Sequence, residues 1–283
     1  MVNSNFNLQI AKNTRDDEFY TTYETVEKEL DHYRKHFKGK TVLCNCDDPF
    51  ESNFCKYFLR NFNTFGLKRL LCTSYKSSKV LSTELLLLDN NNEPLSNKHG
   101  YILDVVKFEN GHKIISEEYI EKWLKNTKCI KKLKGDGDFR SPECIKYLEI
   151  ADIVVTNPPF SLFKDIISLL VKHNKKYLLI GNQNALTYKE IFPLIQNNQA
   201  WTGYQFGDMK FRVPDTAEPR DTRFWIDKFG QKWRSLGNAM WLTNLDIDRR
   251  HKLLKLTKKY SPKIYPKYDD YDAIDVKRVQ DIP

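Results

Sequence analysis

Four short apolar runs recur along this chain, with helix-like segments between most of them, and this alternation constrains the fold more than any other feature. The runs are Thr41–Cys46, Arg69–Tyr75, Ala151–Thr156 and Lys176–Gly181. Parallel strands joined by helical crossovers produce this pattern, because helices then cover both faces of the sheet. The sequence therefore predicts an α/β protein with a doubly wound, Rossmann-like sheet and helices on both faces.

Local signals place several of the helices. Segment 52–65 carries four phenylalanines at helical spacing, which gives one apolar stripe to pack on the sheet: Phe54, Phe58, Phe62 and Phe65. Ser141 followed by Pro142 is typical of a helix start, with an N-cap and then a proline at the first helical position. Thr187 and Glu190 have the spacing of a capping box and predict another helix start.

Two regions depart from the strand–helix alternation. Residues 76–134 hold two strand-like runs, Glu84–Leu88 and Tyr101–Val106, followed by a helix capped by Ser116, and we interpret them as a hairpin insertion. From about residue 201 the chain becomes aromatic and strand-like, which predicts antiparallel strands at the C-terminal edge of the sheet. We expect a catalytic core over residues 1–200, including the insertion, and a second part over residues 201–283.

Composition places the protein among ordinary globular chains. Of 283 residues, 46 are Lys or Arg and 37 are Asp or Glu, a formal charge of +9, and 40% are hydrophobic. No apolar run approaches the roughly 20 residues that cross a bilayer, and the N-terminus lacks a secretory signal. Six cysteines without a CxxC pair are typical of reduced cytosolic thiols, so we expect a cytoplasmic protein with no metal site.

The most informative motif is the tetrapeptide Asn157-Pro158-Pro159-Phe160, which follows a buried-type strand. Ligands of open α/β sheets bind at the carboxyl ends of strands. The prolines stiffen the loop and leave carbonyl groups unclaimed. The Asn157 side-chain oxygen and the Pro158 carbonyl could accept both hydrogens of an aromatic amine, making its lone pair available, while Phe160 stacks on the ring. The alternative is a simple proline turn after a core strand.

Two further loops could serve a nucleoside ligand. In Gly135–Phe139 the glycines allow close approach of the backbone, and Asp138 beside Phe139 could hold an adenine, although such a sequence also forms ordinary turns. Asp47 and Asp48 follow the first strand of the sheet and favour a cationic or hydroxyl-bearing ligand, or they cap the next helix. Neither GxGxxG nor GxxxxGK[ST] occurs, which disfavours dinucleotides and triphosphates.

These three motifs, in this order, resemble those of S-adenosylmethionine-dependent amino-methyltransferases. The closer resemblance is to the EcoRI-type adenine-specific DNA methyltransferase family, and it covers nearly the whole chain. It is carried by six segments: RDDEFYT (15–21), CNCDDPFESNFCKYF (44–58), GDGDFRSPECI (135–145), ADIVVTNPPFSLF (151–163), IGNQNALTYKEIFPLI (180–195) and SPKIYPKYDDYDAI (261–274).

The resemblance implies methyl transfer from S-adenosylmethionine to the 6-amino group of adenine in duplex DNA, after the base is flipped out of the helix. It implies a catalytic loop of Asn157, Pro158, Pro159 and Phe160. The expected cofactor contacts combine the residue-level argument with this resemblance, and they are Phe19, Tyr20, Thr21, Asp47, Asp48, Ser74, Asp136, Gly137, Asp138, Phe139 and Asn157. In a restriction-modification system, a cognate restriction endonuclease is a further expected partner.

The chain departs from the family pattern in three places. The loop after the first strand is not glycine-rich, which makes Asp47 and Asp48 looser assignments. The second strand ends in Thr73-Ser74-Tyr75, without the acid that binds ribose in many methyltransferases, so the ribose partner stays open. Family members are expected to continue beyond Pro283, so we expect part of a DNA-recognition region to be missing.

Basic runs agree with a nucleic-acid partner. Lysines are frequent in residues 122–134, and the stretch 249–267 holds eight Lys or Arg and no acid. From the second run we expect phosphate contacts by Lys255, Lys258 and Lys259, although a solvated charged face is the alternative. Two other functions remain open at this point: methylation of a protein glutamine or an RNA base, or DNA binding with a degenerate cofactor site.

Overall fold

The computed structural model describes residues 19–75, 99–109, 115–215 and 217–283. The chain forms two compact units, the first ending at Leu245 and the second running from Asp246 to Pro283. Among the described residues, the sheet and all the α-helices lie in the first unit. The functional division expected near residue 200 stays a prediction, and strands on both sides of that residue belong to one sheet.

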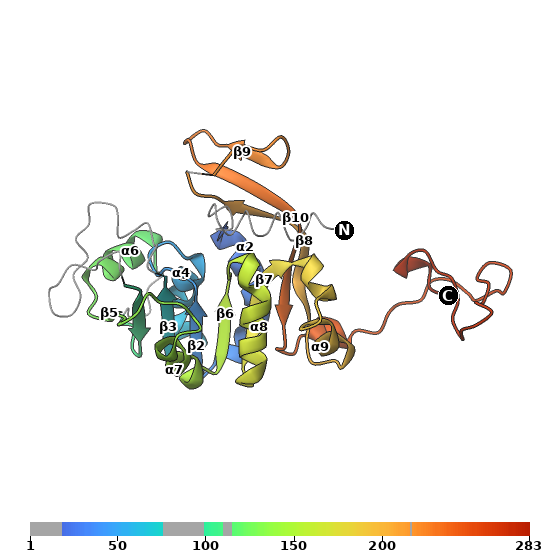
Figure 1. Ribbon diagram of the computed structural model, residues 1–283, viewed down its shortest axis with the longest axis horizontal. Helices are drawn as coiled ribbons and strands as arrows, with labels where there is room; N and C mark the ends of the chain where they lie inside the picture. The colour runs from blue at the N-terminus through green and yellow to red at the C-terminus, as the bar shows by residue number, and fades with distance from the viewer. Residues whose placement is uncertain (1–18, 76–98, 110–114, 216) are drawn as a thin grey trace. The chain divides into compact units, whose positions relative to one another are not determined.

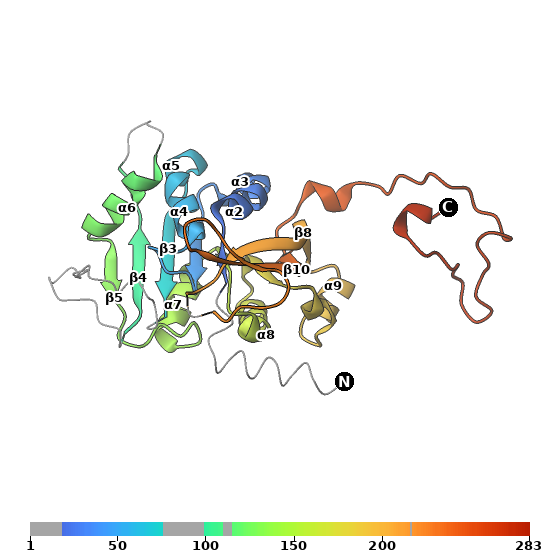
Figure 2. The ribbon, with the colours of Figure 1, turned by 90° about the horizontal axis from the view of Figure 1, so that it is seen from above.

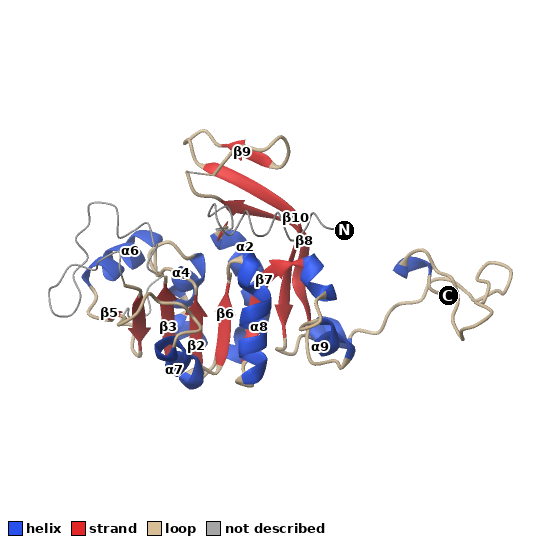
Figure 3. Cartoon of the chain, viewed as in Figure 1, coloured by secondary structure: helices blue, strands red, loops and turns tan. Residues whose placement is uncertain are grey.

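The first unit is built on one ten-stranded sheet (Figures 1 and 3). Its path is β1-β8-β10-β7-β6-β2-β3-β4-β5, and β9 pairs with β10. The strands are β1 (Tyr20–Thr21), β2 (Thr41–Asn45), β3 (Arg69–Ser74), β4 (Tyr101–Val105), β5 (Ile130–Lys132), β6 (Ile153–Thr156), β7 (Lys176–Asn182), β8 (Trp201–Arg212), β9 (Phe224–Ile226) and β10 (Lys232–Thr243).

The centre of the sheet is parallel and its flanks are antiparallel. β3, β2, β6 and β7 pair in parallel, and they are the four apolar runs recognised in the sequence. On one side β10, β8 and β1 continue the sheet antiparallel, and on the other side β4 and β5 do so. The predicted α/β fold, with antiparallel strands after residue 201, is therefore confirmed.

Helices cover both faces of this sheet, as Figure 2 shows from above. α2 (Tyr23–Leu30), α3 (Arg34–Phe37), α4 (Asn53–Arg60), α5 (Phe62–Phe65) and α6 (Glu117–Asn126) lie on one face. The opposite face carries α7 (Pro142–Ile150), α8 (Phe163–Lys172) and α9 (Phe192–Gln196). Among the described residues of this unit, short 3₁₀ segments are η1 (Asp31–Tyr33), η3 (Phe160–Leu162) and η4 (Gln183–Thr187).

The predicted helix starts on Ser116 and Ser141 are confirmed by side-chain caps. The Ser116 hydroxyl accepts a hydrogen bond from Tyr119 N, and the Ser141 hydroxyl accepts one from Cys144 N. The predicted helix over 52–65 is present as α4 and α5, separated at Asn61 and ended by Gly66 in the left-handed region. All four phenylalanines of its stripe are buried, so packing on the sheet decides this segment.

One local prediction was wrong in detail. Thr187 does not start a helix, because it ends η4, and α9 begins only at Phe192 with Pro193 in its first turn. The proline fixes the helix start there, since its fixed φ suits the first turn and its missing N–H costs nothing at that position. In the expected insertion, Tyr101–Val105 joins the main sheet beside β3, and Glu84–Leu88 lies outside the described residues, so the hairpin stays a prediction.

The main hydrophobic core lies between the sheet and the helices α7 and α8. It contains Leu43, Leu71, Val154, Leu179 and Met240 from the strands, with Leu148, Ile166 and Ile167 from the helices. These side chains are almost completely buried, and each contributes about 1.5–3 kcal/mol by leaving water. Among the described residues, no helix has the length and apolar character needed to span a membrane.

The second unit, residues 246–283, has little regular structure. It contains η5 (Asp248–His251), η6 (Val279–Asp281) and one isolated bridge between Lys267 and Ile274. Most of its side chains are exposed, and Tyr265 is its one buried apolar residue beyond Ile247.

Candidate active site

The order of the strands identifies where a ligand binds. From β2 the chain first adds β3 on one side and later β6 on the other, so the carboxyl ends of β2 and β6 are neighbours with helices leaving in opposite directions. Such a switch point is the usual ligand crevice of an open α/β sheet. Cys46–Asp48 follow β2, as the sequence predicted, and residues Asn157–Phe160, here called the catalytic loop after their predicted role, follow β6.

Asp47 joins these two loops. Its side chain is buried, with 6% of its surface exposed. The Ser52 hydroxyl donates to it at 2.8 Å, the Thr156 hydroxyl lies 2.5 Å from its second oxygen, and the backbone N–H of Asn157 also donates to it. Asp47 therefore holds the start of the catalytic loop in place through hydrogen bonds with Thr156 and Asn157. Its expected contact with the cofactor stays a prediction.

Asp48 does not cap the following helix, and neither does Asp47. The N-cap of α4 is Ser52, whose hydroxyl accepts from Phe54 N at 3.1 Å. The Asp48 carboxylate instead accepts from Phe50 N at 2.9 Å and from the Tyr101 hydroxyl, which ties the loop to β4. Because Ser52 caps α4, Asp48 is not needed as a helix cap.

Both carboxyl groups have raised pKa values. Burial raises the pKa of Asp47 to about 7, although its three donors act in the opposite direction. Burial also raises the pKa of Asp48 to about 6, opposed mainly by the Tyr101 hydrogen bond. Because a nearby positive charge favours ionised carboxylates, a cationic ligand at this edge would stabilise both in their charged forms.

Asn157 uses one half of its amide in a hydrogen bond, and the other half has no partner in the protein. Its Nδ2 donates to the backbone carbonyl of Phe19, 138 residues away in the chain. Its Oδ1 is buried and has no hydrogen-bond partner in the protein. A buried acceptor without a partner costs about 1–3 kcal/mol, so this oxygen is well placed to accept a hydrogen from a bound group.

Phe160 packs against Phe19. The two rings are stacked, with centroids 5.3 Å apart and planes 29° apart. Phe19 also meets Phe211 edge-on at 5.6 Å, and the neighbouring β1 pairs with the end of β8 through Tyr20 and Arg212. Segment 19–21 therefore lies against the catalytic loop. The family resemblance predicted Phe19, Tyr20 and Thr21 as site residues, but it did not indicate these contacts.

The loop Gly135–Phe139 reaches the end of β3. Gly137 has a φ of +82°, and a Cβ there would lie 2.1 Å from the carbonyl oxygen of Ser74, so only glycine fits. Asp138 forms a two-point ion pair with Arg140, at 2.7 and 3.0 Å, and this hydrogen bonding lowers its pKa. Phe139 is buried in the main core, which anchors the loop.

Several polar atoms at this edge lack a partner in the protein. They are buried, and they come from the ends of strands or from segment 19–21: Thr21 Oγ1, Asn45 Oδ1, Thr73 Oγ1 and Ser74 Oγ. Such atoms fit a polar ligand that supplies the missing hydrogen bonds. Asn45 and Thr73 were missed in the sequence analysis, although each lies at or next to the end of its strand, where ligands of this fold bind.

The predicted DNA-contacting lysines belong to the second unit. Lys255, Lys258 and Lys259 are exposed, and they lie in a stretch without helix or strand between η5 and the bridge at Lys267. Their expected contacts with phosphates stay a prediction. Elsewhere in the described chain, no group of three His, Cys, Asp or Glu side chains has the arrangement of a metal site, and all six cysteines are free thiols.

A doubly wound sheet with an Asn-Pro-Pro-Phe loop at its switch point is consistent with a Rossmann-like methyltransferase fold. The comparison with family models gives the same answer: residues 7–283 match the family described as adenine-specific methyltransferase EcoRI. The chain belongs to this family, and it is an adenine-specific DNA methyltransferase. Methyltransferases in general take their methyl group from S-adenosylmethionine.

Curated relatives agree over nearly the whole chain. The type II methyltransferase M.EcoRI of Escherichia coli is 44% identical over 280 residues, which cover 98% of this chain and 80% of that protein. M.MpnI of Mycoplasma pneumoniae is 35% identical over 281 residues, 96% of this chain and 76% of its own length. M.MgeORF184P of Mycoplasma genitalium is 35% identical over 279 residues, with the same two shares. No solved structure gives a significant match.

Proposed function

We propose that this enzyme methylates the 6-amino group of an adenine that is flipped out of duplex DNA into the crevice at the ends of β2 and β6. The single observation that carries this proposal is the buried Oδ1 of Asn157, which has no partner in the protein. A base inside the duplex could not reach this atom, so base flipping is part of the proposal.

The proposed role of the catalytic loop is to make a poor nucleophile reactive. The lone pair of the adenine amine is delocalised into the ring. Asn157 Oδ1 and the Pro158 carbonyl accept the two amine hydrogens, which favours a tetrahedral nitrogen with an available lone pair. The Phe19 carbonyl holds the Asn157 amide in the orientation that presents Oδ1. No general base is needed before attack, because the proton is lost after the methyl group has moved.

Phe160 is proposed to stack on the flipped adenine. An aromatic face replaces part of the stacking that the base loses on leaving the duplex, about 1–3 kcal/mol per base. One face of Phe160 already lies against Phe19. We propose that this contact supports the ring while its other face receives the base. Pro159 keeps the loop rigid between the two groups.

The unpartnered atoms at the ends of the strands support a site for S-adenosylmethionine, which supplies a methyl group activated on a sulfonium. Ser74 is proposed to hydrogen-bond the ribose, and Asp138 with the backbone of Asp136 and Gly137 to hold the adenine end. Asp48 and segment Phe19–Thr21 are proposed to bind the amino-acid end, where a carboxylate attracts an ammonium group. Thr21 Oγ1 and Ser74 Oγ are buried without partners, which fits these roles.

The proposed partners follow from the substrate. Duplex DNA is the first, with Lys255, Lys258 and Lys259 proposed as phosphate contacts. A cognate restriction endonuclease is proposed as a second partner, because relatives are named as type II methyltransferases. Because the substrate is genomic DNA, we propose that the enzyme works in the cytoplasm of a prokaryotic or phage-infected cell.

The test is methyl transfer from radiolabelled S-adenosylmethionine to four acceptors in parallel: mixed-sequence duplex DNA, single-stranded DNA, RNA and a whole-protein extract. We expect label in duplex DNA, recovered as N6-methyl-2′-deoxyadenosine after digestion to nucleosides. Label in RNA or in protein glutamine alone would replace this proposal with another substrate. Label in cytosine would retain the amine chemistry and overturn the choice of base.

A further inference from the structure

The antiparallel strands β8, β9 and β10 extend beyond the edge where the catalytic loop lies. β10 pairs with β7 only from Ala239 onward, opposite Asn182, the last residue of β7. Its first residues, from Lys232 to Leu236, pair with β8 and β9 alone. This extension, here called the ribbon, is formed by β9 and the outer halves of β8 and β10, and it rises past the carboxyl ends of the parallel strands (Figure 1).

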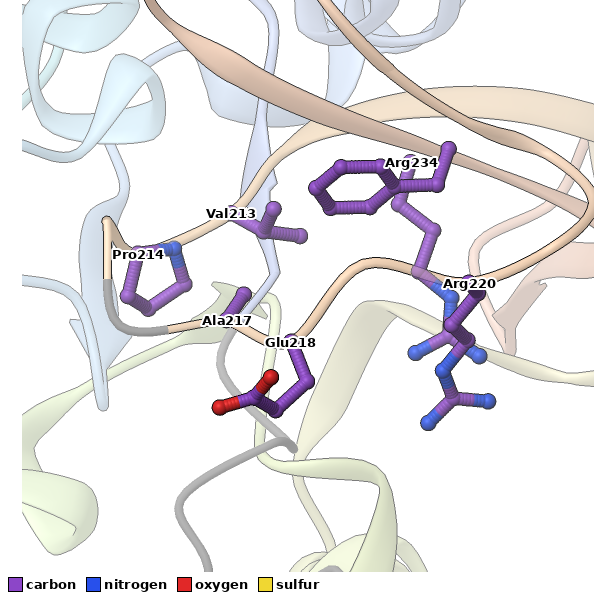
Figure 4. Close-up of a pocket in the computed structure, with 7 residues that line it drawn as sticks. Val213, Pro214, Ala217, Glu218, Arg220 and Arg234 are labelled. Carbon is purple, nitrogen blue, oxygen red and sulfur yellow. The ribbon is translucent and has the colours of Figure 1, made fainter.

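Three arginines gather beside the ribbon, one from β10 and two from the segment that leads into β9. We call Arg234, Arg220 and Arg223 the arginine cluster. Arg220 and Arg234 line one small pocket together with Val213, Pro214, Ala217, Glu218 and Phe224, and Figure 4 shows both guanidinium groups on the same side of it. All three arginines line an adjoining open hollow, whose other side chains include Thr222, Ser235 and Asn238. Three cations and several hydrogen-bonding side chains therefore face one surface.

Acidic side chains lie near this cluster, and the ion pair between Asp208 and Arg223 is exposed. Glu218 lines the first pocket, and Asp208 lies 3.3 Å from Arg223 in an exposed ion pair that also includes a hydrogen bond from Ser235. Both partners of this pair are more than half exposed, so water screens their attraction and a strong anionic ligand can compete for the guanidinium.

Contacts with β10 fix the position of Arg223. Its φ of +59° lies in the left-handed region, which non-glycine residues seldom adopt. Its guanidinium lies over Gly237, where a Cβ would come within 2.0 Å of Nη1. Gly237 therefore leaves the space that Arg223 occupies, and a hydrogen bond from Ser235 N to the Arg223 carbonyl fixes the backbone at 2.9 Å.

Arg234 links the arginine cluster to the catalytic loop through Phe19. The Arg234 guanidinium lies 5.3 Å from the centre of the Phe19 ring, in a cation–π contact. Phe19 in turn stacks on Phe160 and accepts the hydrogen bond from Asn157. A nucleotide held at Phe160 and Asn157 thus has its sugar and phosphates close to this surface.

We propose that the arginine cluster binds the backbone phosphates of DNA beside the flipped adenine. Guanidinium groups bind phosphate oxygens in two-point hydrogen bonds, which position the strand as well as attract it. This inference rests on the proposed function, because it needs duplex DNA as the substrate. It adds a phosphate site in the first unit, distinct from the lysines of the second unit.

The test is the salt dependence of binding to a mixed-sequence duplex oligonucleotide, which does not require the recognition sequence. The variant is Arg220→Gln/Arg223→Gln, because neither residue touches the catalytic loop. The matched control is Lys38→Gln/Lys68→Gln, which removes two exposed charges beside the opposite ends of β2 and β3. Arg220→Gln alone tests an exposed side chain without disturbing the backbone at Arg223, and Arg220→Lys/Arg223→Lys tests whether charge suffices.

Each lost phosphate contact lowers the slope of log affinity against log salt by about 0.9, so the double variant should lose up to about 1.8. Between 50 and 200 mM salt the parent should then lose about 12-fold more affinity than the variant. The slope for Arg220→Gln alone should fall by up to about 0.9. The Arg220→Lys/Arg223→Lys variant should recover most of the slope but less of the affinity.

The inference would be overturned if the double variant and Arg220→Gln had the same salt slopes as the parent and as the Lys38→Gln/Lys68→Gln control. The proposed function would remain intact in that case. A parent protein that does not bind duplex DNA at all would overturn the proposed function itself. Thermal unfolding of each variant shows whether the ribbon remains folded, and the result with Arg220→Gln decides if the double variant is unfolded.

Discussion

Replacing Asn157 by alanine tests the proposed chemistry at a single atom. The variant removes Oδ1, the buried acceptor without a partner, and also Nδ2, which donates to the Phe19 carbonyl. Losing one acceptor that acts in the transition state lowers turnover by about 10²- to 10³-fold, or about 2.7–4 kcal/mol. Stability should change little: the lost Nδ2 bond costs about 1 kcal/mol, and removal of an unpaired buried oxygen offsets a similar amount.

The assay is single-turnover methyl transfer to duplex DNA at saturating S-adenosylmethionine, together with chemical unfolding of the same protein. Asn157→Asp keeps an acceptor oxygen and should retain more activity than alanine. The same substitution on the exposed end of α6, Asn126→Ala, should leave the rate unchanged. A rate within about threefold of the parent in Asn157→Ala would remove this side chain from the mechanism, since the effect predicted for a transition-state acceptor is at least 30 times larger.

Three further predictions address other parts of the site. Phe160→Ala should weaken capture of the flipped base by about 5- to 150-fold, the equivalent of 1–3 kcal/mol of stacking, while Phe160→Tyr retains it; unchanged fluorescence quenching of 2-aminopurine at the target position would refute stacking. Because the pKa of Asp47 is raised from 3.8 to about 7 in the folded state, the unfolded chain releases this proton first, and the free energy of unfolding should fall by up to about 4 kcal/mol as the pH rises from 4 to 7. In urea titrations, the Asp47→Asn variant should lack that part of the fall. A pH profile equal to that of the parent would contradict the raised pKa of Asp47. Replacing Lys255, Lys258 and Lys259 by glutamine should weaken binding to all DNA sequences alike and lower the salt slope by up to about 0.9 per lost contact, whereas an identical slope would assign these lysines to solvent.

The parallel centre of the fold could be predicted because each strand carries its own signal. β2, β3, β6 and β7 are buried on both faces, so each is a continuous apolar run that stands out in the sequence. β5 is a strand of only three residues, Ile130–Lys132, with two lysines, and it forms because β4 offers an open edge. Nothing local in its sequence indicates that partner.

The position of Asn157–Phe160 at the end of β6 could be predicted, because a rare tetrapeptide at the end of a strand is a local signal. Its supporting contacts could not. The hydrogen bond from Asn157 to Phe19 and the contact from Thr156 to Asp47 each join residues more than 100 positions apart, and only the folded sheet brings them together. The alternative that Asp47 or Asp48 caps the next helix is wrong for a similar reason, since Ser52 is the cap and Asp47 is held by both Ser52 and Thr156.

The central claim is that this chain methylates adenine in duplex DNA at defined sites. The most direct measurement is sequencing, with detection of modified bases, of DNA from cells that express the parent chain or Asn157→Ala. We predict N6-methyladenine at every copy of one short sequence in the first culture and at background level in the second. DNA without this mark in cells that contain the folded parent protein, or the same mark in both cultures, would contradict the account.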